Sequence, residues 1–64
     1  MNAPQATPPT RRQIRRWRQY LADERAEAAV YRALGERKHG AEQQILFGLA
    51  DAEKRHEAHW LALL

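Results

Sequence analysis

Three residues with metal-binding side chains interrupt segments that otherwise place apolar residues at helical spacing. Glu53 and His56 lie three residues apart in DAEKRHEAH, between the apolar segments ILFGLA and WLALL, and Glu24 interrupts a similar series in the first half. A buried carboxylate without a partner costs several kcal/mol or takes up a proton. A divalent cation compensates two carboxylates and a neutral imidazole well. These residues are therefore candidate metal ligands.

The elements that must position these residues are two helices. Ala, Leu, Glu, Arg and Gln dominate the composition and β-branched residues are scarce, which is typical of long helices. Thr10 and Gln13 have the form of a capping box, which predicts a helix over about 11–38. Lys38 and His39 suit the end of that helix, and Gly40 is suited to be its left-handed terminator.

The rest of the chain completes an all-α hairpin. A second helix is expected over about 41–64, so that 10–64 form one domain, and residues 1–9, with three prolines, are expected to be a disordered leader. The closing segment WLALL has no polar residue and no C-cap, so we expect that the chain was cut from a longer protein.

The register of the hairpin predicts that the candidate ligands meet. The first helix has Ile, Trp, Leu, Glu, Ala and Tyr at alternating spacings of three and four, and the second helix continues the same spacing through Glu53 and His56. If the chain turns near residues 39 and 40, Glu24 lies level with residue 55. At about 1.5 Å per residue, the three ligands then fall within roughly one helical turn of the same height.

The short chain limits the classes of protein that remain. Sixty-four residues bury little apolar surface, so a bound metal or association with further copies is needed for stability. The absence of cysteine excludes disulfides and thiolate metal sites. No apolar run is long enough to span a bilayer, and the N-terminus lacks the apolar core of a signal peptide.

Pairing of two chains would enlarge the small apolar core and complete the set of metal ligands at once. A four-helix bundle with two carboxylate-bridged irons uses a Glu from each of two helices and Glu-x-x-His from each of the other two. One chain has half of this set, in Glu24, Glu53 and His56. We therefore predict a homodimer, or a multiple of dimers, that forms a four-helix bundle.

Plainer interpretations exist for each residue near the site. A single Glu in a helix interface often sets the register, and Glu-x-x-His is common in helices. Tyr31, two turns after Glu24, is either a core aromatic residue or a partner of the site. His59 is either a surface or supporting histidine, or forms a zinc pair with His56. Glu27 and Glu57 are better explained as solvated residues than as an acidic access path for cations.

The segments ADERAEAAVYRAL and QILFGLADAEKRHEAHW resemble the N-terminal ferritin-like domain of bacterial vacuolar iron transporter family proteins. They are also similar to the encapsulated ferritins, whose two-helix subunits (half-ferritins) form a four-helix site on dimerisation. The similarity covers roughly 16–64. It implies that Glu24, Glu53 and His56 are iron ligands, with Glu53 as the bridge between two metals, and that the activity is ferroxidase, the oxidation of iron(II) by dioxygen.

The same resemblance implies a cellular setting. In the transporter relatives a membrane domain follows the second helix, so we expect a C-terminal transporter domain and a place on the cytoplasmic side of a bacterial membrane. The alternative is a cargo of an encapsulin shell, although no docking tail is visible. Five arginines would then face an anionic membrane surface. They are Arg11, Arg12, Arg15, Arg16 and Arg18.

Two other functions compete with iron oxidation. The same ligands with zinc, manganese or iron would make a non-catalytic metal-binding or sensing module. A basic helical dimer could also bind nucleic acid through its arginines. We do not expect nucleic-acid binding, because the chain lacks a recognition-helix pattern and the second helix is not basic.

Overall fold

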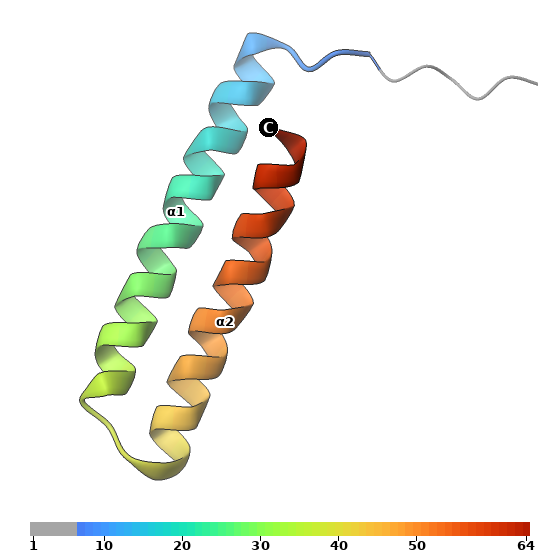
Figure 1. Ribbon diagram of the computed structural model, residues 1–64. Helices are drawn as coiled ribbons and strands as arrows, with labels where there is room; N and C mark the ends of the chain where they lie inside the picture. Colours follow the sequence, from blue (N-terminus) through green and yellow to red (C-terminus); the bar gives the residue numbers. More distant parts are fainter. Residues whose placement is uncertain (1–6) are drawn as a thin grey trace, which may run out of the picture.

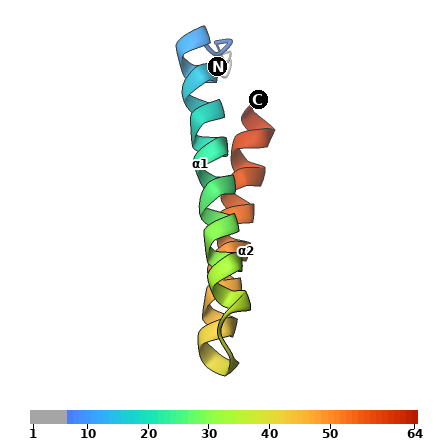
Figure 2. The ribbon, with the colours of Figure 1, turned by 90° about the vertical axis from the view of Figure 1, so that its left-hand side faces the viewer.

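The protein is a hairpin of two antiparallel α-helices, described here for residues 7–64 of a computed structural model (Figure 1). Helix α1 spans Arg11–Glu36 and helix α2 spans Gly40–Leu63. Seen after a turn of 90°, the two helices form a single layer, and none of residues 7–64 covers either broad face (Figure 2). The described residues contain no strand, which confirms the all-α prediction. None of their helices is both long and apolar enough to cross a membrane.

The start of α1 is fixed by the predicted capping box. The backbone N–H of Gln13 donates to Thr10 Oγ1 at 3.1 Å, and the backbone N–H of Thr10 donates to Gln13 Oε1 at 2.8 Å. Two backbone donors that have no partner within the helix are thereby satisfied. Residues 7–10 precede α1 without regular secondary structure. The rest of the expected leader, residues 1–6, lies outside the described residues.

The turn is placed differently from the prediction. Helix α1 ends at Glu36 rather than near 38, because the backbone N–H groups of Arg37 and Lys38 bond back three residues and close its last turn. Gly40 has the expected positive φ, 57°, but it is the first residue of α2 and does not terminate α1. His39 is the N-cap of α2, and its side chain makes no capping hydrogen bond.

The helices pack through small residues and a thin apolar core. Leu21, Ala28 and Ala50 are the buried apolar residues of the described chain. Near the turn Gly35 allows close approach, because a Cβ built there would lie 2.6 Å from the Phe47 ring. We call the residues of both helices that face each other the seam. A seam with so few buried side chains gives the hairpin little hydrophobic stabilisation of its own.

Candidate metal centre

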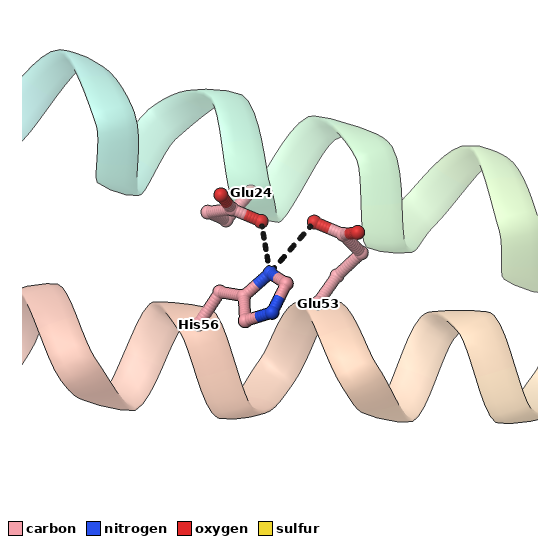
Figure 3. Close-up of side chains that lie close together, drawn as sticks. All are labelled: Glu24, Glu53 and His56. Carbon is pink, nitrogen blue, oxygen red and sulfur yellow. Dashed lines mark hydrogen bonds and ion pairs between the residues drawn. The ribbon is translucent and has the colours of Figure 1, made fainter.

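The three predicted ligands come together about halfway along the hairpin. Glu24 comes from α1, and Glu53 and His56 lie one turn apart on α2, so that all three side chains point toward one another (Figure 3). One ligand atom from each residue lies within 4.8 Å of the others. The register inferred from sequence, with Glu24 opposite the interval between Glu53 and His56, is therefore correct.

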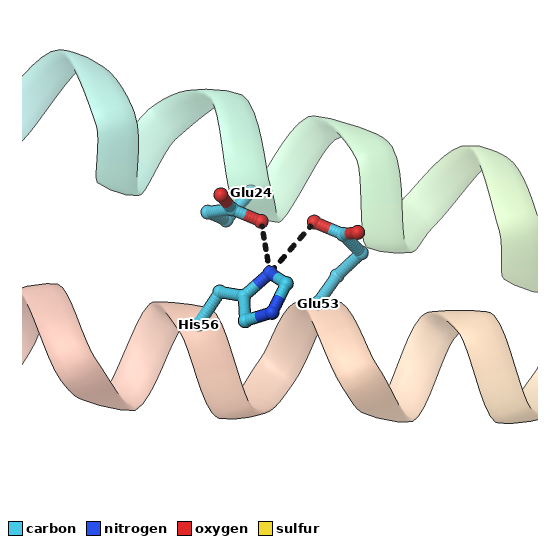
Figure 4. A network of polar contacts seen from close by, with 3 residues as sticks. All are labelled: Glu24, Glu53 and His56. Carbon is cyan, nitrogen blue, oxygen red and sulfur yellow. Dashed lines mark hydrogen bonds and ion pairs between the residues drawn. The ribbon is translucent and has the colours of Figure 1, made fainter.

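The imidazole of His56 contacts both carboxylates through the same nitrogen. Its Nδ1 lies 3.2 Å from Glu24 Oε2, within hydrogen-bonding distance, and 3.7 Å from Glu53 Oε2 (Figure 4). Nδ1 donates to Glu24 when it carries a proton. The other ring nitrogen points away from both carboxylates (Figure 4). Deprotonation of Nδ1 would turn this nitrogen into a ligand that faces the same point as two carboxylate oxygens.

Glu53 is the residue whose environment is least satisfied. Its side chain is 14% exposed, and its Oε2 is a buried polar atom without a hydrogen-bond partner. A buried oxygen left without a partner costs about 1–3 kcal/mol. A cation placed between Glu24, Glu53 and His56 would supply the missing interaction. The buried oxygen and the converging ligands both favour a cation here.

Glu27 lies beside the predicted ligands and adds a third carboxylate. Its pKa is raised above 4.5, first by a side-chain hydrogen bond with Glu53 and next by the negative charge of Glu53. Loss of solvation and the charge of Asp23 raise the pKa further, whereas His56 lowers it. In the metal-free protein Glu27 therefore holds its proton to a higher pH than an ordinary glutamate does. A cation would relieve the same repulsion. Glu27 is an exposed residue in contact with the site.

The other residues singled out from the sequence lie around this group. Glu57 accepts a hydrogen bond from Arg25 Nε at 2.9 Å, an ion pair that the spacing of the seam did not predict. His59 packs edge-on against the Trp60 ring, with centroids 4.8 Å apart. Tyr31 is half-buried, and within residues 7–64 its hydroxyl makes no hydrogen bond.

His56 differs from the two carboxylates in facing outward. Its side chain is 58% exposed, whereas that of Glu24 is 19% exposed. The seam predicted from sequence ran through His56, so the outward position of this residue corrects that part of the prediction. Residues Ile45, Leu49, Ala52 and His56 are spaced four, three and four apart and form a stripe on α2 turned by about 100° from the residues of α2 that face α1 in the structure. His56 therefore joins the hairpin's own seam to an uncovered face.

One hairpin offers an incomplete coordination sphere. Two carboxylates and one imidazole suit iron, zinc or manganese. The donors exclude a soft thiolate-type site, since the chain has no cysteine. Three ligands leave positions for water, a substrate or ligands from a second chain.

Comparisons with known protein families, curated proteins and solved structures find no match for this chain. The functional assignment therefore depends on the residues and geometry of the chain itself. The coarse conclusion is a two-helix protein with a Glu/His group suited to hold a metal ion.

Proposed function

We propose that two copies of the hairpin pair into a four-helix bundle and bind two iron ions between them. The observation that carries this proposal is the buried Oε2 of Glu53, which accepts no hydrogen bond, in a group of converging ligands. Each chain contributes Glu24, Glu53 and His56, so the pair provides four carboxylates and two imidazoles. This is the ligand set of carboxylate-bridged di-iron bundles.

The face that would pair is uncovered and apolar. On α2 Ile45 and Leu49 are 63% and 40% exposed, and on α1 Val30 and Leu34 are 56% and 42% exposed. When each helix is viewed along its axis from its N-terminus, these residues lie on the same rotational side of the seam. Antiparallel helices are related by an approximate two-fold axis perpendicular to their common plane, so these side chains lie on one side of the hairpin. His56 belongs to the same stripe, and pairing through this face would bring the two ligand sets together.

The chemistry proposed for the pair is oxidation of iron(II). Each of two iron(II) ions gives up one electron, and dioxygen accepts both electrons and two protons to form hydrogen peroxide. The carboxylates favour the more highly charged iron(III) product because they are anionic oxygen donors. Storage of the oxidised iron, or delivery to a membrane iron transporter, would follow from this activity.

A second candidate is a metal-binding or sensing module without oxygen chemistry. It is favoured by the same donor set, since carboxylate and imidazole also suit zinc and manganese. Oxygen uptake separates the two functions, because zinc has no redox chemistry. An iron-loaded protein that consumes no dioxygen would exclude the ferroxidase and leave this alternative.

Native mass spectrometry without oxygen tests the shared site directly. With iron(II), we expect two irons per dimer, and we expect Glu53→Ala to lose them. The matched control is Glu42→Ala, which removes an exposed carboxylate from the same helix. Iron bound equally well by monomers would refute the shared site, and a protein that binds no metal would refute the function altogether.

A further inference from the structure

A row of arginines follows one face of α1 at the open end of the hairpin. Arg11, Arg15 and Arg18 are spaced four and three residues apart, so their side chains project from the same side of the helix. All three are exposed and, within the described residues, none forms an ion pair. The sequence has no acidic residue before Asp23. The row therefore has no anionic partner near it on α1.

These charges are unfavourable for the helix that carries them. The N-terminal end of a helix has a positive partial charge, which favours acidic residues and disfavours basic ones. The first turn of α1 has no acidic residue and begins with Arg11 and Arg12. Basic residues placed where they destabilise the helix indicate that their charges have another function. An anion outside the hairpin would satisfy them.

The same end of the molecule also exposes apolar side chains. The arginines and Ile14 line a hollow of about 360 Å³. Leu61 and Leu64, at the end of α2, are 48% and 47% exposed. The start of α1 and the end of α2 lie at this open end (Figure 1). By helical rotation at about 100° per residue, Ile14 and Leu61 are turned from the seam toward the side of the arginine row.

This surface stays free when two hairpins pair as proposed. The arginine row is turned from the seam in the opposite sense to the stripe that contains Ile45 and His56. The two surfaces therefore lie on opposite sides of the hairpin. A partner bound by the arginine row would not compete with pairing or with the metal centre.

We infer that this surface, formed by Arg11, Arg15 and Arg18 with Ile14 and Leu61, docks on a bilayer that contains anionic phospholipids. Guanidinium groups bind phosphate oxygens in a bidentate manner, and each basic residue near an anionic bilayer adds to its binding. The half-buried Ile14 and the exposed Leu61 provide the aliphatic side chains that enter the boundary between headgroups and acyl chains. A nucleic acid would use the arginines but would leave Ile14 and Leu61 in water, so the combination favours a lipid surface.

Vesicle flotation tests this inference with the metal-free chain of 64 residues. The vesicles are phosphatidylcholine alone or an equal mixture with phosphatidylglycerol. We expect binding to the mixed vesicles only, and we expect Arg11→Gln, Arg15→Gln and Arg18→Gln combined to weaken it on the order of 100-fold at low salt. Glutamine is a good helix former, and far-UV circular dichroism checks that the helices are retained.

A matched control removes the same number of charges from the other end of the hairpin. Arg32→Gln, Arg37→Gln and Lys38→Gln combined should change binding by less than about threefold, because these residues lie near the turn. Equal losses in both triple variants would show an effect of net charge alone and would overturn the docking surface.

A neutral substitution tests the apolar part of the surface. Leu61→Ser leaves the charge unchanged and should weaken vesicle binding about fivefold. Binding to duplex DNA that matches vesicle binding and is insensitive to Leu61→Ser would assign the arginines to nucleic acid and overturn the proposal.

Discussion

Replacing Glu53 by leucine should stabilise the metal-free protein while abolishing metal binding. The buried Oε2 without a partner costs about 1–3 kcal/mol, and leucine removes that cost and adds apolar contact in the seam. It also removes the repulsion between Glu53 and Glu27. We expect the metal-free protein to gain about 1–3 kcal/mol. For a domain of this size, each kcal/mol corresponds to about 4–8 °C in Tm.

Thermal unfolding followed by far-UV circular dichroism measures both effects. The first series is run in chelator at a fixed protein concentration, because pairing makes Tm depend on concentration. The second series adds iron(II) without oxygen. Metal at about 100 times its Kd stabilises a protein that binds it by roughly 2.7 kcal/mol. The wild type should show this increase in Tm, and Glu53→Leu should not.

Glu42→Leu is the matched control for this experiment. Glu42 is on the same helix, its side chain is 72% exposed and its contact is an ion pair with Lys38 at 3.7 Å. Loss of such a surface pair should cost about 0.5 kcal/mol or less and leave the metal effect intact. If Glu53→Leu is less stable than wild type in chelator, the reasoning from the buried oxygen is wrong. If the variant retains the metal effect, Glu53 is not a ligand.

Two further predictions concern residues next to the site and near the turn. Because the pKa of Glu27 is raised in the folded protein, the folded state holds this proton more tightly than the unfolded chain. Metal-free stability should therefore rise as pH falls from neutral toward 4.5, and urea unfolding of Glu27→Gln should lack this component. An unchanged pH profile in the variant would show that Glu27 is not its source. The Gly35→Ala variant should lose about 1 kcal/mol of unfolding free energy, because its Cβ would lie 2.6 Å from the Phe47 ring. The Gly48→Ala variant should gain about 1 kcal/mol, because nothing lies within 4 Å of its Cβ and alanine favours the helix. Equal gains from both alanines, measured in urea, would contradict the close approach at Gly35.

The sequence predicted the helices and their register because both depend on local patterns. The capping box at Thr10 and the three–four spacing of the seam are complete within short segments. Together they placed Glu24 beside His56, and the 3.2 Å contact confirms that placement. The exact turn was not predictable in the same way. A glycine with positive φ can end one helix or begin the next, and Gly40 does the latter.

The surroundings of the site were harder to predict than its ligands. The pairing of Arg25 with Glu57 involves long side chains beside the seam, whose direction helical spacing does not determine. The outward position of His56 required a second periodicity to be recognised beside the first. Pairing of two chains stays a prediction, because it depends on contacts between separate molecules rather than on a pattern within one.

The short turn also sets the order in which contacts can form during folding. The hydrogen bond from Gln43 to the carbonyl of Gly35 joins residues eight apart, whereas the contact of Glu24 with His56 joins residues 32 apart. Closing the shorter loop costs less entropy, so pairing should start at the turn and proceed toward the open end. The ligands meet only after the half of the hairpin nearest the turn has formed. When the unfolded chain folds in the presence of iron, the metal should therefore bind only after the helices have paired. Loss of the metal should begin with fraying of the helices at the open end.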